Sequence, residues 1–305
     1  EKTMKTKRWW RFLPLILITI YSCSPSSKKG ESIYFGGRIA NAQTDSIYVL
    51  LNNREKAFAL DFDGNFSDTI QLVDEGYKKL SIDREEFTIY LIPGDSLVLN
   101  ADLNQIENQF KFSGKGENRN NYLVQKSFKT DQFLTNNTAL FQLSPIDFRS
   151  KIKTFHDNVF KNLQKLDVNS SFIKTEEQNL NYDFINLLYM YKDTYAYYNP
   201  TSQQLPVDFL DELNKIDLDN DDDYKTYQSY RNIVLTHLQE DLYQGFSADS
   251  LLKKIKSPSI KNGFINTLIY ELNPNDPNST AIYETIKKHC NYKPWLDEAD
   301  KRMKK

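Results

Sequence analysis

The sequence predicts an α+β protein in which an antiparallel β-sandwich or barrel is followed by an all-helical domain. From residue 31 to about residue 112, apolar and polar side chains alternate and turn residues recur at short intervals. Beyond Gly114-Lys115-Gly116, apolar residues instead recur every three or four positions. Strands repeat every two residues and helices every 3.6. We therefore expect a β-domain over 31–116 and a helical domain over 117–305, joined at two glycines that favour flexibility.

About eight short strands account for the first domain. The segment 45–51 is rich in β-forming residues and more continuously apolar than the first strand, which suits a strand buried on both faces. Phe58, Leu60 and Phe62 alternate and lead into Asp63-Gly64, a dipeptide typical of β-hairpins. The other expected strands cover 33–39, 66–72, 80–82, 87–91, 97–101 and 110–112. Many short strands with close turns are typical of a sandwich or barrel.

The second domain has the pattern of packed helices. Ser144-Pro145 combines a capping residue with proline at the first helical position, and one apolar face follows over 148–166. A second apolar face runs over 180–198 and ends at Asn199-Pro200. Further helices are expected over 206–216, 227–242, 247–256, 259–272, 279–289 and 295–305.

The N-terminal segment has the features of a secretory signal. Basic residues over 5–11 precede an apolar run over 12–20, which Pro14 interrupts. This run is too short for a membrane span of about 20 residues. Ile20-Tyr21-Ser22-Cys23 is similar to a bacterial lipobox, in which Cys23 is acylated and becomes the mature N-terminus. We expect residues 1–23 to be a lipoprotein signal peptide and residues 24–30 a polar linker.

Composition excludes several classes of function. The formal net charge of −2 offers no footprint for nucleic acid. With Cys23 acylated, Cys290 is the one remaining cysteine, which excludes an intrachain disulfide, a C-x-x-C pair and a four-cysteine zinc site. We expect no cofactor and no metal.

Two short motifs suggest chemistry but lack its other requirements. Gly94-Asp95-Ser96-Leu97 spells the block of GDSL-type esterases, yet it continues as a strand and no histidine stands in the required relation to an aspartate. The segment 217–223 is similar to the start of a calcium loop, but Asp222 and Gln228 occupy the positions of the required glycine and glutamate. We therefore predict a Pro-Gly turn and an acidic helix N-terminus, respectively.

The remaining candidates favour structure or binding over catalysis. His289 and Cys290 are adjacent on a helix and point about 100° apart, so they form a poor nucleophile and base pair. Tyr189 and Tyr197 do not fit the apolar face that Tyr191 and Tyr195 extend. We predict no catalytic residue. For Tyr189 and Tyr197 we favour packing between two layers of helices, and the alternative is an exposed surface for a partner or ligand.

The order of several motifs resembles one family of envelope lipoproteins. They are Gly37-Arg38-Ile39-Ala40-Asn41-Ala42, Leu60-Asp61-Phe62-Asp63-Gly64-Asn65-Phe66, Tyr90-Leu91-Ile92-Pro93-Gly94-Asp95-Ser96-Leu97 and Phe112-Ser113-Gly114-Lys115-Gly116 before Asn121-Tyr122-Leu123. Together they resemble the N-terminal region of Bacteroidetes-type TlpA/ResA-like thioredoxin-family lipoproteins. The resemblance implies a β-domain and a helical domain that precede a thioredoxin domain with a W-C-x-x-C motif, which this sequence lacks.

These observations predict a lipid-anchored cell-envelope protein that acts as a binding or positioning module. We expect it at the outer membrane facing the periplasm, with a thioredoxin-like domain or protein as a partner. One alternative is a fragment of a thiol-disulfide oxidoreductase whose catalytic domain lies beyond Lys305. Another is an independent glycan- or peptide-binding lipoprotein.

Overall fold

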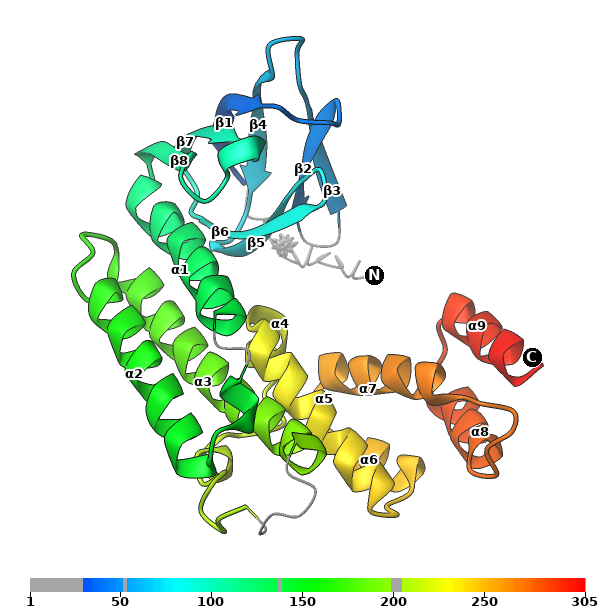
Figure 1. Cartoon of the computed structure of the whole chain (residues 1–305). Helices are drawn as coiled ribbons and strands as arrows, with labels where there is room; N and C mark the ends of the chain where they lie inside the picture. The colour runs from blue at the N-terminus through cyan, green and yellow to red at the C-terminus, as the bar shows by residue number, and fades with distance from the viewer. Residues whose placement is uncertain (1–29, 52–53, 137–138, 199–204, 305) are drawn as a thin grey trace, which may run out of the picture.

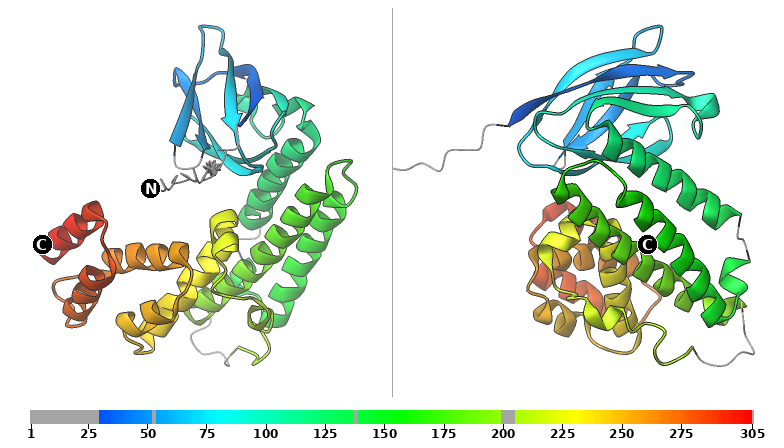
Figure 2. Two further views of the ribbon diagram at one scale, coloured as in Figure 1. Left: turned by 180° about the vertical axis from the view of Figure 1, so that it is seen from behind. Right: turned by 90° about the vertical axis from the view of Figure 1, so that its left-hand side faces the viewer.

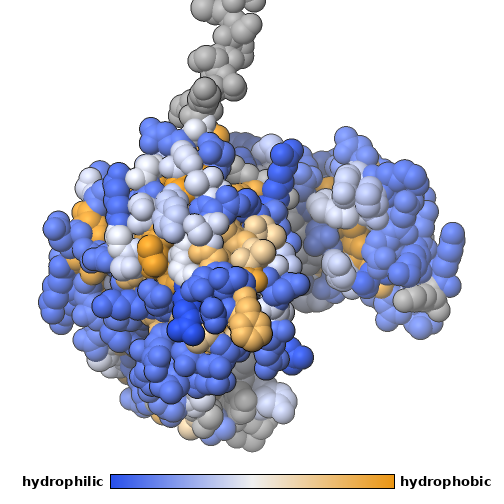
Figure 3. Space-filling model, turned by 90° about the horizontal axis from the view of Figure 1, so that it is seen from above, coloured by the Kyte–Doolittle hydropathy of each residue, from blue (hydrophilic) through white to orange (hydrophobic). Residues whose placement is uncertain are grey.

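The computed structural model describes residues 30–51, 54–136, 139–198 and 205–304, and it confirms the α+β fold. A β-unit lies above a group of helices, and the chain passes from one to the other through α1 (Figure 1). The helices beyond α6 extend away from the rest (Figure 2). Seen from above, they form a lobe at one side of a mostly hydrophilic surface (Figure 3).

The β-unit is an open sandwich, not a barrel. Its two four-stranded sheets have the orders β4-β1-β7-β8 and β3-β2-β5-β6. The strand pairs are antiparallel except β1 with β7, which is parallel. The strands are β1 (Glu31–Ala40), β2 (Ser46–Leu51), β3 (Arg54–Ala59), β4 (Asn65–Leu72), β5 (Gly76–Ile82), β6 (Glu85–Leu91), β7 (Ser96–Asp102) and β8 (Phe110–Lys115).

The alternation in the sequence becomes the division between core and surface. In β1, Ile33 and Phe35 are buried between the sheets, and Phe35 makes edge-to-face contacts with Phe58 and Phe66. The prediction that residues 45–51 are buried on both faces is wrong. Ile47 and Val49 point into the core, whereas Tyr48 and Leu50 are 38% and 37% exposed. Only the inner face of a sandwich sheet is covered, so β2 alternates like its neighbours.

The predicted hairpin at Asp63-Gly64 is also wrong, although a tight turn is present. β3 and β4 flank this turn but belong to different sheets, so the turn carries the chain across the sandwich. The Asp61 carboxylate accepts the N–H groups of Asp63 and Asn65 at 2.9 and 2.8 Å, and Gly64 has φ = +79°. The turn residues were identified correctly, but they do not decide which strand pairs with which.

The helix α1 (Glu117–Thr135) closes the open side of the sandwich. β6 and β8 are edge strands, and an unpaired edge exposes backbone groups. The Asn120 side chain accepts from Tyr90 N–H at 2.8 Å and donates to Tyr90 C=O at 3.1 Å. The Asn121 side chain makes the same pair of bonds with Phe112, both at 2.8 Å. Two adjacent asparagines therefore satisfy one edge of each sheet.

An ion pair fixes the same end of α1. Arg119 pairs with Asp95, and both side chains are almost completely buried. The Arg119 Nε–H also donates to Tyr90 C=O at 3.1 Å, and Asp95 accepts from Ile92 N–H at 2.8 Å. Gly116 has φ = +109°, and a Cβ there would lie 2.6 Å from the Arg119 guanidinium. The glycine at the joint thus permits close packing.

The rest of the described chain is helical. α2 (Pro145–Leu163) begins at Ser144, whose hydroxyl accepts from Asp147 N–H as predicted. The segment 206–216 forms turns and the short 3₁₀-helix η3 (Leu213–Lys215), so the helix expected there is wrong. The other helices are α3 (Ser170–Tyr198), α4 (Asp221–Thr226), α5 (Gln228–Tyr243), α6 (Ala248–Lys254), α7 (Pro258–Glu271), α8 (Ser279–His289) and α9 (Lys293–Met303).

The junction between the β-unit and the helices has its own core. Tyr90 of β6 packs against Phe172 of α3 with ring centroids 5.0 Å apart, and Tyr122 of α1 contacts the same ring. On its other side, α1 adds Val124 and Phe128 to the core of the sandwich. The helix α1 therefore contributes to both units. The division into separate domains at 31–116 and 117–305 stays a prediction.

Substitution of Asn120 should destabilise the protein. Asn120→Ala removes the side-chain partner of the buried Tyr90 N–H and one of the two donors to Tyr90 C=O. We expect a loss of about 1–3 kcal/mol in the free energy of unfolding. Urea denaturation measures this loss. Asn118→Ala on the same helix removes only an exposed bond to Asp167 C=O and should change stability by less than about 0.5 kcal/mol. Equal effects of the two substitutions would contradict the edge-capping role.

Candidate functional site

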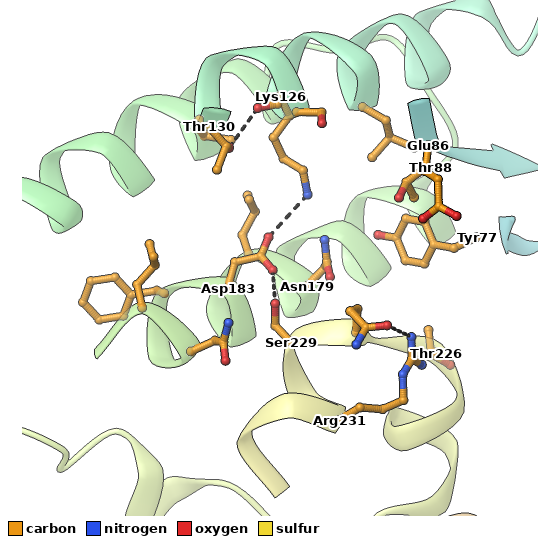
Figure 4. Close-up of a pocket in the computed structure, with 18 of the residues that line it drawn as sticks. Tyr77, Glu86, Thr88, Lys126, Thr130, Asn179, Asp183, Thr226, Ser229 and Arg231 are labelled. Carbon is orange, nitrogen blue, oxygen red and sulfur yellow. Dashed lines mark hydrogen bonds and ion pairs between the residues drawn. The ribbon is translucent and has the colours of Figure 1, made fainter. Parts of the chain in front are cut away.

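A large cleft lies where the β-unit, α1–α3 and α4–α5 meet. Its volume is about 1240 Å³. One wall is the outer face of the β3-β2-β5-β6 sheet, where Tyr77, Lys79 and Thr88 point away from the sandwich core. The opposite walls come from the helices (Figure 4). The polar residues of this lining include Lys126, Thr130, Asp131, Asn179, Asp183, Asn186, Thr226, Gln228, Ser229 and Arg231.

Local structure places the side chains of α5 in the cleft. Asn220 caps α4 by accepting from the N–H groups of Asp222 and Asp223. α4 ends at Thr226, and Tyr227 takes an extended conformation before α5 begins. This break turns the chain so that Ser229 and Arg231, in the first turn of α5, line the cleft opposite the sheet.

The polar floor of the cleft is a network of charges from α1 and α3. Lys126 Nζ lies 2.7 Å from Glu176 Oε1 and 3.4 Å from Asp183 Oδ2. The Glu176 side chain is fully buried, and that of Lys126 is 15% exposed. Asp183 also accepts from the Ser229 hydroxyl at 2.5 Å. A buried carboxylate requires such partners, because its desolvation is costly.

Hydroxyl and amide groups complete the coordination of Glu176. The Tyr77 hydroxyl donates to Glu176 Oε2, and Asn179 donates to the same oxygen at 3.3 Å. Burial raises the pKa of Tyr77, and the Glu176 carboxylate raises it further, so Tyr77 stays protonated and donates. Burial alone would lower the pKa of Lys126, but the carboxylates of Glu176 and Asp183 outweigh it and raise that pKa.

The cleft also has an apolar side. Phe155 from α2 and Phe184, Leu187 and Met190 from α3 line it, together with Leu134 from α1. His156 lies beside this group, with its ring 5.5 Å from that of Phe184 and its Nδ1 3.3 Å from Asp157 Oδ1. Apolar walls with a few placed polar groups are the usual composition of a ligand site.

Comparisons of the chain with protein-family models, with curated proteins and with solved structures found no match. Within the described residues, no group of three or more histidine, cysteine or acidic side chains is placed to hold a metal ion. None of the helices described here combines the length and apolar character that crossing a membrane requires.

The structure does not bring the predicted surface tyrosines together. Tyr189 is only 2% exposed, and its hydroxyl lies 3.3 Å from His237 Nδ1, so it is packed between helices and the alternative of a surface is wrong for this residue. The helix α3 packs against α2 on one side and α5 on another, so its buried surface is wider than one stripe. Tyr197 is 81% exposed near the end of α3, but it does not line the cleft. Cys23 lies outside the described residues.

The rejected motifs have structural roles. Asp95 is the partner of Arg119, and Ser96 begins β7. Asp219 and Asp221 accept backbone N–H groups from Lys256, Ser257 and Ser259, and thereby join α4 to the start of α7. Hydrogen bonds from Lys225, Ser257 and Ser259 lower the pKa of Asp221.

His289 and Cys290 also have structural roles. Cys290 is buried, and its thiol faces Tyr292 C=O at 3.7 Å. His289 Nε2 lies 2.7 Å from Asp249 Oδ1, so its nearest charged group is a carboxylate. Neither side chain lines the cleft.

No sequence motif identified the residues of the charge network. Lys126 and Glu176 lie 50 positions apart, so their pairing depends on the fold. One signal was present, because Phe172, Glu176 and Leu180 are spaced four apart and share one helix face. A glutamate on an otherwise apolar stripe indicates a buried partner.

Removing Lys126 should destabilise the protein. Lys126→Met leaves the buried Glu176 carboxylate without its cation, and we expect a loss of about 3–5 kcal/mol in the free energy of unfolding. The double variant Lys126→Met/Glu176→Leu should recover most of this loss, because it removes both charges. Denaturant unfolding measures both effects. Lys129→Met, at an exposed position of the same helix, is the control. If it costs as much as Lys126→Met, the network does not stabilise the junction.

Proposed function

We propose that this protein is a lipid-anchored cell-envelope binding or positioning module, and that the cleft holds its ligand or partner. The observation that carries the proposal is a cleft of about 1240 Å³ with both an apolar wall and a set of charged and polar side chains. Ligand sites commonly measure about 300–1,000 Å³ and combine these two kinds of lining.

The chemistry of the lining favours binding over catalysis. Ser229 donates to the Asp183 carboxylate and not to a histidine, so it lacks the base that activates a serine nucleophile. Among the described residues that line the cleft, none is a cysteine. Lys126 is held as a cation by two carboxylates, which disfavours a role as a nucleophile.

The family resemblance gives the proposal its biological setting. We infer that the chain corresponds to the accessory region of TlpA/ResA-like lipoproteins, with a thioredoxin-like domain or protein as a partner. A fragment of such an oxidoreductase, with its catalytic domain beyond Lys305, is the alternative from the same resemblance. The charged cleft supports another candidate, an independent lipoprotein that binds peptides or glycans, because it offers hydrogen-bonding groups for a polar ligand.

Lipid attachment should depend on Cys23. In cells that express the full chain, Cys23→Ala should abolish incorporation of labelled fatty acid, and should either release the protein from the membrane fraction or leave it unprocessed. Covalent acyl chains contribute about 0.8 kcal/mol per buried CH₂ to membrane binding, and the variant lacks the cysteine that would carry them. Cys290→Ala, at the buried free cysteine, should leave labelling unchanged. Unaltered labelling in the Cys23 variant would show that the lipobox assignment is wrong.

Two asparagines of α3 allow a matched test of the cleft. Asn186 lines the cleft, whereas Asn181 is exposed and does not. A photo-reactive amino acid introduced at position 186 should form a discrete adduct in intact cells, detected by mass spectrometry of the purified protein. The same residue at position 181 should form none. Adducts of equal yield at both positions, or none at either, would contradict the cleft as the binding site.

A further inference from the structure

The charge network leaves an excess of negative charge at one side of the cleft. Two carboxylates, Glu176 and Asp183, share the single ammonium of Lys126. The shorter contact goes to Glu176, and Asp183 is the more distant partner at 3.4 Å. The Asp183 side chain is 38% exposed and lines the cleft. An additional cation that approached Asp183 from the cleft would compensate this charge.

Arg231 leaves an excess of positive charge at another part of the cleft. Its guanidinium has five N–H donors. It makes three bonds: those to Tyr224 C=O and Lys225 C=O cap the end of α4, and the third goes to the Gln228 side chain. In the described part of the chain, no carboxylate lies within ion-pair distance of Arg231. Burial lowers the pKa of Arg231, in keeping with a cation that lacks a counter-ion. Two N–H groups therefore remain for an anion.

The negative charge of Asp183 and the positive charge of Arg231 both lie at the wall of the cleft. Asp183 projects from α3 and Arg231 from α5, and Ser229 lies between them in this view (Figure 4). The apolar side of the cleft, with Phe184 and Met190, continues from the same helix as Asp183. A complementary ligand therefore carries a positive group, a negative group and apolar surface.

We propose that the cleft binds short peptides with free termini, whose ammonium pairs with Asp183 and whose carboxylate pairs with Arg231. This inference rests on the proposed function, because it takes the cleft as the ligand site. Arginine is suited to carboxylates, since two of its N–H groups can bind both oxygens. The cleft volume exceeds that of a typical small-ligand pocket, so side chains of a peptide fit along the apolar wall.

Titration calorimetry with blocked peptides tests the assignment. The probes are Ala-Phe, Ala-Phe-Ala and Ala-Phe-Phe-Ala, which span roughly 3.3–3.6 Å per residue. Each peptide is prepared in a free, an N-acetylated and a C-amidated form, and each form is titrated into the detergent-solubilised full chain. At the best length, either blocked form should bind about tenfold or more weakly than the free peptide, because a charged hydrogen bond is lost.

Two variants assign each terminus to its residue. In Asp183→Asn, N-acetylation should no longer weaken binding, while C-amidation still does. In Arg231→Gln, C-amidation should no longer weaken binding, while N-acetylation still does. Circular dichroism verifies the folding of each variant. If Arg231→Gln unfolds, Arg231→Lys is used instead; it keeps the charge but cannot bind both carboxylate oxygens as arginine does, so C-amidation should weaken binding less than it does in the parent protein. Asp211→Asn and Arg84→Gln, at exposed positions outside the cleft, should leave both preferences unchanged.

Each other outcome overturns the inference. If blocked and free peptides bind equally, the cleft binds peptides without recognising their charged termini. If both variants lose both preferences together, the two residues do not act on separate termini. If no peptide binds at any length, the ligand belongs to another class, and an adduct at position 186 would still support the cleft as a binding site. If no adduct forms at position 186, the result contradicts the proposed function, because the cleft is then not the binding site.

Discussion

The attachment of α1 to the sandwich is the interaction on which the rest of the structure depends. Three consecutive residues each satisfy a different part of the β-unit: Arg119 reaches Asp95, Asn120 reaches β6 and Asn121 reaches β8. Without them, two sheet edges would present unpaired backbone groups beside a buried aspartate. Unsatisfied buried groups cost more than the net gain from an average hydrogen bond. These contacts therefore define the direction in which the helical part leaves the sandwich.

That direction also creates the cleft. α1 contributes Val124 and Phe128 to the sandwich core and Lys126 to the charge network with α3. The same helix thus holds the outer sheet face at one wall and the acidic residues of α3 at the other. Because Glu176 is fully buried, the network tolerates little separation of the two units. A binding site at such a junction is built from elements that neither unit supplies alone.

Local patterns predicted the elements well and their partners poorly. Alternation identified the strands, and Ser144-Pro145 identified a helix start, since both signals lie within a few residues. The crossing at Asp63-Gly64 was missed because strand pairing is decided by distant segments. The burial of Tyr189 was missed because α3 is covered on two sides. No local signal indicates that Lys126 pairs with Glu176, or that Arg231 has no carboxylate within ion-pair distance in the described part of the chain. The site could therefore be recognised only in the folded arrangement.

The run Arg119-Asn120-Asn121 has a consequence for the evolution of this chain. Each residue of a helix is rotated by about 100° from the one before, so one inserted or deleted residue between Gly116 and Arg119 would turn all three side chains away from their targets. Point substitutions remove one contact, but a shift in length removes the whole set at once. This joint therefore tolerates changes of residue identity more readily than changes of spacing.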